Sequence, residues 1–145
     1  MSDAPKVAGH CLCGGVSFSG TLKSQDVIAC HCGMCRRWTG GPLMFVDVDG
    51  APDFEGRELI RVYRSSEKGE RGFCKRCGTI LFWKVAGEEV YTFTAGALDD
   101  ASRLTFTREI FIEDKPHFYA FANDTVKQTG SDAMTGYFAA DEKTD

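Results

Sequence analysis

Apolar and polar residues alternate with a period of two in several short segments of the chain, the pattern of half-buried β-strands. Val16-Ser17-Phe18-Ser19 alternates strictly after a Gly-Gly turn and predicts the second arm of a hairpin. The same pattern predicts strands at 27–29, 43–48, 58–64 and 108–112, and a hairpin formed by 80–83 and 90–94. We expect a polar loop at 65–72, a short helical turn at 99–102 and no long amphipathic helix, hence a mainly β fold.

The length of 145 residues is near the commonest size of one domain. No linker or repeat divides the chain, so we expect a single domain over 1–145 with its core at about 6–120. Apolar patterning fades near residue 123, and residues 123–145 are predicted to form a C-terminal tail that docks only through Tyr137 and Phe138.

Composition and charge exclude several classes of function. The 17 Lys and Arg against 21 Asp and Glu give a net charge of −4, which offers little attraction for nucleic acid or anionic lipid. Every apolar run is far shorter than the roughly 20 residues that span a bilayer. Residues 1–6 lack a basic start and an apolar stretch, so we expect no secretory signal and a cytoplasmic protein.

The seven cysteines fall into three groups along the sequence: Cys11 and Cys13; Cys30, Cys32 and Cys35; Cys74 and Cys77. In a reducing compartment, closely spaced thiols are more often metal ligands or catalytic groups than disulfides. The Cys74-x-x-Cys77-Gly78 segment has the form of a metal knuckle, in which the glycine accepts the positive φ of the turn. Metal binding is therefore the favoured interpretation.

Pairing the two outer groups gives a closed Cys₄ site and leaves Cys30, Cys32 and Cys35. A metal ion held by three protein ligands keeps a position for water or substrate, so this division predicts one structural and one catalytic site. Spacing alone leaves an alternative open, because Cys32 and Cys35 with either outer pair would also complete a tetrahedron. A thioredoxin-like dithiol is disfavoured because neither Cys-x-x-Cys is expected to open a helix after a strand in a βαβ setting.

The residues beside the central thiols have chemistry of their own. His31 is a candidate proton shuttle or ligand, but we expect it at the surface because neighbours on an extended segment point apart. Arg36 and Arg37 are candidates for binding a carboxylate-bearing substrate. His117 is expected in a loop. The aromatic residues are expected to form core or pocket wall: Trp38, Phe82, Trp83, Phe111, Phe118 and Tyr119.

Three ordered motifs resemble the glutathione-dependent formaldehyde-activating enzymes, a family that includes relatives of centromere protein V. They are Cys11-x-Cys13-Gly14-x-Val16, Cys30-His31-Cys32-x-x-Cys35-Arg36 with Thr39-Gly40, and Phe73-Cys74-x-x-Cys77-Gly78-Thr79. A weaker match lies at 110–116, after which His117 stands where the family leads us to expect tryptophan.

The resemblance implies a fold of small curled antiparallel sheets, called a β-tent, with two zinc ions per chain. It implies structural zinc on Cys11, Cys13, Cys74 and Cys77, and catalytic zinc on Cys30, Cys32 and Cys35. The implied activity is a carbon–sulfur lyase reaction run in the synthetic direction, in which the glutathione thiol adds to formaldehyde to give S-hydroxymethylglutathione.

Position beside the open site suggests that Arg36 and Arg37 hold the carboxylates of glutathione. Thr39, Gly40 and Gly41 are suggested to supply backbone N–H groups to the same substrate. The alternatives are a zinc-stabilised interaction module without activity, a carrier of formaldehyde or thiols, and a dithiol redox protein.

Overall fold

The computed structural model describes residues 4–135 and confirms a mainly β chain with little helix. The tail residues 136–145, with the predicted docking of Tyr137 and Phe138, lie outside the described residues. Within the described range the chain forms two compact units, one of residues 4–27 and 45–105 and the other of 28–44 and 106–135. None of the helices in the described part is long and apolar enough to cross a membrane.

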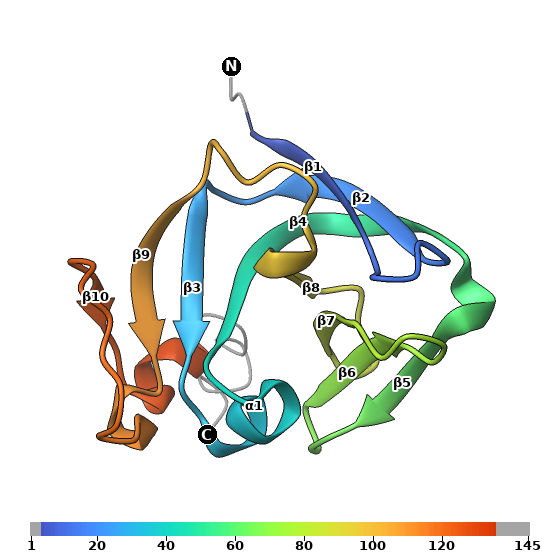
Figure 1. The fold of residues 1–145 in the computed structure, drawn as a ribbon. Coiled ribbons are helices and arrows are strands. Elements are labelled where there is room, and N and C mark those ends of the chain that lie inside the picture. The colour runs from blue at the N-terminus through green and yellow to red at the C-terminus, as the bar shows by residue number, and fades with distance from the viewer. Residues whose placement is uncertain (1–3, 136–145) are drawn as a thin grey trace. The chain divides into compact units, whose positions relative to one another are not determined.

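The first unit contains an antiparallel sheet (Figure 1). Its strand order is β1-β2-β4-β8-β7-β6-β5. The strands are β1 (Lys6–His10), β2 (Ser17–Leu22), β4 (Leu43–Glu55), β5 (Ile60–Arg64), β6 (Gly69–Cys74), β7 (Ile80–Val85) and β8 (Tyr91–Thr94). The predicted hairpins β1–β2 and β7–β8 are confirmed. Two 3₁₀ turns, η1 (Arg57–Leu59) and η2 (Ala95–Ala97), complete this unit.

Aromatic rings fill the interior of this sheet. The centroid of Phe18 lies 4.5 Å from that of Phe93, and Phe82 lies 5.3 Å from Phe54 and 5.1 Å from Tyr91. Ring pairs at such distances add about 0.5–1.5 kcal/mol each beyond the burial of apolar area. These contacts join strands β2, β4, β7 and β8, and two of them, β2 and β7, directly follow the turns that hold cysteines.

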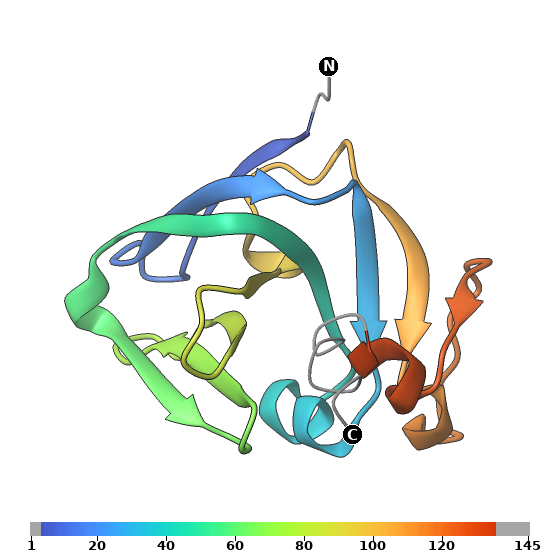
Figure 2. The ribbon, with the colours of Figure 1, turned by 180° about the vertical axis from the view of Figure 1, so that it is seen from behind.

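The second unit contains helix α1 (Gly33–Thr39), β9 (Thr105–Ile110), η3 (Ile112–Asp114) and β10 (Val126–Lys127). Strand β3 (Asp26–Cys30) leads into α1, and β9 lies beside it in both Figures 1 and 2. Strand β10 pairs parallel with β9, and residues 130–135 are helical. Residues 125–130, placed by prediction in the tail, thus form backbone hydrogen bonds within this unit, including Gln128 N–H to Glu109 O at 2.9 Å.

Five local predictions differ from the structure. The predicted polar loop at 65–72 contains the start of β6, a strand paired with β5 and β7. Its Gly69 and Gly72 lie against the rings of Trp83 and Phe82, where a Cβ atom would come within 2.5 Å and 2.2 Å of ring atoms. These positions are therefore buried by aromatic side chains from β7 rather than by their own side chains. Strand β4 continues past Val48, because β2 pairs with residues 49–55.

The other three differences concern one helical turn and the ends of two strands. The helical turn expected at 99–102 is absent, and η2 forms just before it at 95–97. The strand expected at 108–112 begins at Thr105 and ends at Ile110, because Phe111 adopts a left-handed conformation with φ of 55°. Similarly, the strand expected from Glu58 begins at Ile60, after the 3₁₀ turn η1.

Candidate metal centres

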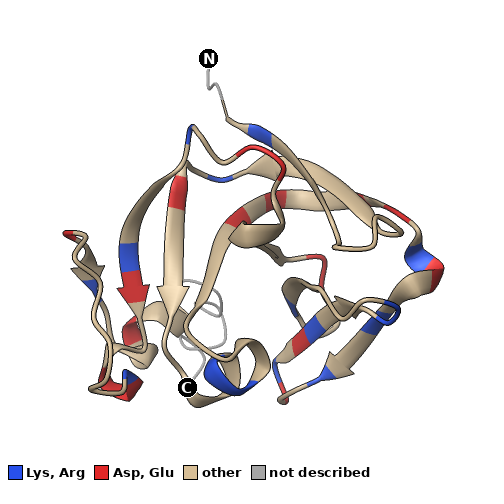
Figure 3. Ribbon diagram, in the orientation of Figure 1, with Lys and Arg blue, Asp and Glu red and all other residues tan. Residues whose placement is uncertain are grey.

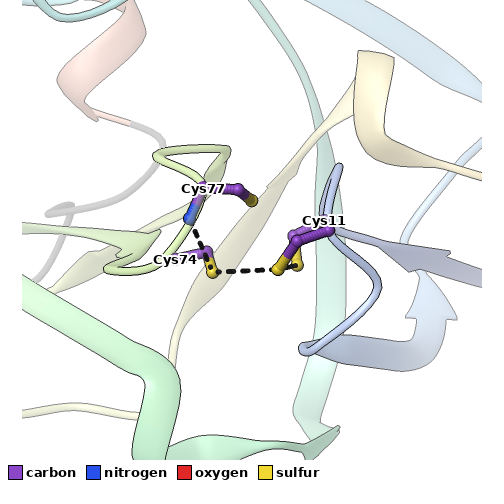
Figure 4. Close-up of side chains that lie close together, drawn as sticks. Cys11, Cys74 and Cys77 are labelled. Carbon is purple, nitrogen blue, oxygen red and sulfur yellow. Dashed lines mark hydrogen bonds between the residues drawn. The ribbon is translucent and has the colours of Figure 1, made fainter.

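The thiols of Cys11, Cys13, Cys74 and Cys77 converge in the first unit from two distant segments (Figure 4). Their sulfur atoms all lie within 4.8 Å of one another. The sulfur of Cys13 lies 3.5 Å from that of Cys11 and 3.8 Å from that of Cys74. A tetrahedral zinc ion with Zn–S bonds of about 2.3 Å sets its sulfur atoms about 3.8 Å apart, so this set fits zinc.

Both segments are tight turns that the sequence explains. Gly78 has φ of 82°, as predicted, and its N–H donates to the carbonyl of Cys74 at 2.7 Å. The N–H of Cys77 points at the sulfur of Cys74 at 3.5 Å. On the other side, the N–H of Val16 donates to the sulfur of Cys11 at 3.3 Å. These backbone N–H groups hold the sulfur atoms of Cys11 and Cys74 against their own turns.

Polar groups around this cluster favour thiolates at its outer edge. A hydrogen bond from the Thr79 side chain is the largest cause that lowers the pKa of Cys77 to about 5. The pKa of Cys13 is lowered first by the backbone N–H of Gly15 and then by Arg76, whose Nε lies 3.2 Å from its sulfur. Burial raises the pKa of Cys74. The exposed and half-buried thiols are thus the ones stabilised as anions.

The thiols of Cys30, Cys32 and Cys35 form a second cluster, in the second unit, and all three are buried. Neighbouring thiols, acting through hydrogen bonds from Cys32 and then Cys35, raise the pKa of Cys30 strongly. Three thiolates this close repel one another unless a cation lies among them. Among residues 4–135, no fourth His, Cys, Asp or Glu joins this group. The structure thus groups the seven thiols as four and three, and each group can hold a metal ion.

Helix α1 positions two of these three cysteines, although the sequence indicated only an extended segment. Cys32 is the N-cap, and its sulfur accepts the N–H of Cys35 at 3.3 Å. Gly40 ends the helix with φ of 87°. The Cys32-x-x-Cys35 motif therefore opens a helix after strand β3, which corrects that part of the prediction and leaves the βαβ setting of a redox dithiol unsupported. The convergence of a third buried thiol, Cys30, is the feature that favours a metal ion here.

His31 is completely buried, so the predicted surface placement is wrong. Its backbone N–H donates to the carbonyl of Ile110 at 3.1 Å, which fixes the residue against the end of β9. Its ring nitrogens are both engaged, Nε2 with Glu109 Oε1 at 2.8 Å and Nδ1 with Tyr119 Oη at 2.7 Å. With both nitrogens hydrogen-bonded, His31 serves this network rather than a metal ion.

The candidate substrate residues lie along α1, whose last turn is basic (Figure 3). Arg36 is half-buried and donates from Nε to the carbonyl of His31 at 3.0 Å, whereas Arg37 is exposed. A Cβ atom added at Gly33 would lie 3.2 Å from the Arg37 guanidinium. The N–H of Gly40 donates to Arg36 O at 2.8 Å, and that of Gly41 to Thr39 Oγ1 at 3.1 Å. These N–H groups have partners within the chain, which leaves the arginines as the better candidates.

Of the remaining predictions for histidine and aromatic residues, some are confirmed and one is wrong. His117 is exposed in a loop, as expected. Phe82 is buried, but Phe118 is 75% exposed and is therefore not part of the core. Of the two partners of His31, Glu109 received no role from the sequence and Tyr119 was expected only in the core or a pocket wall. The only sequence signal for the hydrogen bonds of His31 was the Cys-His-Cys motif. The position of His31 is fixed there because both of its neighbours are candidate metal ligands.

A mainly β chain with a complete four-thiol cluster and a separate three-thiol cluster defines a class of proteins built around cysteine metal sites. Comparison with known proteins gives the family. Residues 6–114 match the family model of the glutathione-dependent formaldehyde-activating enzyme. The chain therefore belongs to this family of enzymes.

Relatives agree with this assignment, and a solved structure is similar in fold. A Schizosaccharomyces pombe protein named as an uncharacterized lyase is 33% identical over 131 residues, covering 90% of this chain and 96% of the relative. A Halomonas elongata protein, named provisionally as a glutathione-dependent formaldehyde-activating enzyme, is 28% identical over 122 residues, covering 74% of this chain and 76% of the relative. The crystal structure of a Rhodobacter sphaeroides protein is similar in fold, with a TM-score of 0.52 and 24% identity over 63% of this chain and 87% of that chain.

Proposed function

We propose that this protein adds the thiol of glutathione to formaldehyde and gives S-hydroxymethylglutathione, a carbon–sulfur lyase reaction in the synthetic direction. Zinc on Cys11, Cys13, Cys74 and Cys77 is structural. Zinc on Cys30, Cys32 and Cys35 is catalytic, which makes two ions per chain. The observation that carries this proposal is the three-thiol cluster, which is buried and gains no fourth His, Cys, Asp or Glu from residues 4–135.

The donor set suits a thiol substrate. A zinc ion held by three thiolates offers a fourth position, at which it would lower the pKa of an entering thiol and hold its sulfur near the aldehyde carbon. The protein itself holds the sulfur atoms of the three cysteines in position. The capping geometry of Cys32 and its bond from the N–H of Cys35 fix the first turn of α1 in place.

The chain also supplies charge for the rest of the substrate. Glutathione carries two carboxylates, and guanidinium groups bind carboxylates through two parallel hydrogen bonds. Arg36 and Arg37 lie within five residues of the cluster's Cys32 and Cys35, on the same short helix. Thr39 holds the helix end through its hydroxyl, which donates to Cys35 O at 3.0 Å. We assign substrate binding to these residues with Gly40, and a cytoplasmic location to the protein.

A Cys32→Ser variant tests the proposal, because serine keeps the N-cap hydrogen bond but is a poor zinc ligand. Wild type is expected to contain two zinc ions by mass spectrometry and to accelerate adduct exchange in two-dimensional NMR above the protein-free rate. The variant should contain one zinc ion and lose at least about 100-fold of the acceleration. Met34→Ala, an exposed change on the same helix, is the control.

Other outcomes identify the alternatives. Two zinc ions with no acceleration would indicate an interaction module or a carrier. Zinc-free chains with reversible disulfides would indicate a dithiol redox protein and would overturn the proposal.

A further inference from the structure

A cavity of about 300 Å³ lies in the first unit, against strands β5, β6, β7 and β8. These strands are neighbours in the antiparallel sheet (Figure 1). None of the seven cysteines lines the cavity, so it belongs to neither metal centre. Its volume is at the lower end of the range of small-molecule sites, so the cavity suits a small ligand.

Cross-strand pairing explains why the polar side chains of this cavity share one face of the sheet. Glu70 on β6 is the partner of Lys84 on β7, which is in turn the partner of Tyr91 on β8. Directly opposite residues project to the same side of a sheet, so these three form one row. Phe82 precedes Lys84 by two residues and projects to that side as well. Its partner is Gly72, where a Cβ atom would come within 2.2 Å of the ring, so the missing side chain leaves room for Phe82.

Aromatic rings form an apolar wall of the cavity. The ring centroid of Phe54, at the end of β4, lies 5.3 Å from that of Phe82 and 5.9 Å from that of Tyr91. Phe82 and Tyr91 meet edge to face, with centroids 5.1 Å apart. Ile60 and Val62 of β5 add aliphatic surface to the lining. Rings that hold one another in this way offer a fixed apolar surface, which favours a ligand with a flat apolar body.

The polar side chains of the cavity keep hydrogen-bond donors for a ligand. Lys84 is buried, and its ammonium group lies 3.3 Å from Glu70 Oε1 and donates to the carbonyl of Val85 at 3.0 Å. An ammonium group has three N–H donors, so these contacts leave one. Tyr91 is only 8% exposed, and its hydroxyl has no hydrogen-bond partner among residues 4–135. Burial raises the pKa of Tyr91, so this hydroxyl keeps its proton and can donate.

Arg57, in the turn η1, gives the cavity an excess of positive charge. Its guanidinium lies 5.1 Å from the centroid of the Phe54 ring and makes no hydrogen bond or ion pair within residues 4–135. Glu70 offsets the charge of Lys84, so the charge of Arg57 is the one that the lining side chains leave unbalanced. A guanidinium binds a carboxylate through two parallel hydrogen bonds. The net charge and the donors therefore fit a single carboxylate.

We propose that this cavity is a binding site for a small carboxylate with a flat aromatic body. The aromatic body packs against Phe54 and Phe82. The carboxylate accepts hydrogen bonds from Arg57, Lys84 and Tyr91. No cysteine takes part, so the ligand binds without a change in metal content, whether or not the chain acts on formaldehyde. Benzoate is the simplest member of this class and serves as the probe.

Titration of the ¹⁵N-labelled protein with benzoate, followed by two-dimensional NMR, tests the proposal. We expect saturable shifts of the amide signals of Phe82 and Lys84, a Kd on the order of 1 mM and an unchanged zinc content. Acetate keeps the carboxylate without the ring, and benzyl alcohol keeps the ring without the carboxylate. Each should bind at least about 10-fold more weakly than benzoate. The absence of saturable shifts, or equal binding of acetate or inorganic phosphate, would overturn the proposal.

Two variants and a matched control locate the ligand. Arg57→Gln should weaken benzoate binding at least about 10-fold, and Tyr91→Phe, which removes only the hydroxyl, about 5-fold. Arg61→Gln is the control, because Arg61 lies between Ile60 and Val62 on β5 and so projects to the opposite side of the strand. It should bind benzoate within about twofold of wild type. Unchanged binding in Arg57→Gln, or an equal loss in both arginine variants, would show that benzoate does not occupy this cavity.

Discussion

The two cysteine clusters differ in how far apart in the chain their ligands lie. The four-cysteine cluster joins Cys13 to Cys74, which are 61 residues apart, whereas Cys30, Cys32 and Cys35 lie within six residues. A metal ion that closes a long loop stabilises the fold by restricting the unfolded chain, and a metal ion on adjacent residues restricts it far less. The first cluster is therefore suited to holding the fold, and the second can specialise in chemistry.

The clusters also differ in how the protein treats negative charge. At the four-cysteine cluster, polar side chains and backbone N–H groups lower the pKa values of Cys13 and Cys77. At the three-cysteine cluster, the buried thiols raise the pKa of Cys30. In the first set, Cys13 and Cys77 are prepared as thiolates by their protein surroundings, whereas the second set depends on a bound cation for its charge.

The largest expected effect is that of Cys11→Ser, which removes a fully buried ligand of the long-range cluster. We expect the melting temperature to fall by more than about 10 °C, because a structural metal site contributes folding free energy directly. Cys32→Ser should lower it by only a few degrees. Calorimetry of both variants, with zinc content, checks this. Equal losses would contradict the division of roles.

The charge difference predicts a difference in thiol reactivity in metal-free protein. At pH 7, Cys77 with its pKa of about 5 is a thiolate, so iodoacetamide should modify it at least about 10-fold faster than Cys30, whose pKa is raised. Peptide mass spectrometry measures both rates. Fast modification of Cys30 would show that its thiol is not held in the neutral form.

The lowered pKa of Cys77 also makes the stability of the metal-free protein depend on pH. Because folding lowers the pKa of Cys77 from 9.0 to about 5, its contribution to metal-free stability is full above pH 9. That contribution shrinks as the pH falls and is lost below about pH 5. Urea unfolding of metal-free wild type and Cys77→Ser should therefore differ most at high pH and converge near pH 5.

The smallest expected effect is that of Arg37→Ala, since this side chain is exposed. We expect a change in stability within about 0.5 kcal/mol and a rise of a few-fold in KM for glutathione that weakens at high salt. Arg61→Ala, an exposed arginine on β5, is the matched control. An equal rise in both variants would indicate general charge attraction rather than a contact at α1.

Several features could be predicted because their cause is local. Hairpins β1–β2 and β7–β8 follow from alternation and turn residues, and the Gly78 turn follows from the Cys-x-x-Cys-Gly motif. Strand β6 could not be predicted, since Gly69 and Gly72 carry no apolar side chain and are buried by rings from β7. Helix α1 has seven residues, too few for a period of 3.6 to be recognised.

The sequence by itself determined the supply of ligands: seven thiols in three groups, each on or beside a turn that presents sulfur. Only the tertiary structure decided which thiols meet and what surrounds them, because that depends on pairing between strands far apart in the chain. His31 shows the difference most clearly. Its neighbours in sequence are two cysteines, but its burial and both of its ring contacts come from Glu109 and Tyr119, at least 78 residues away.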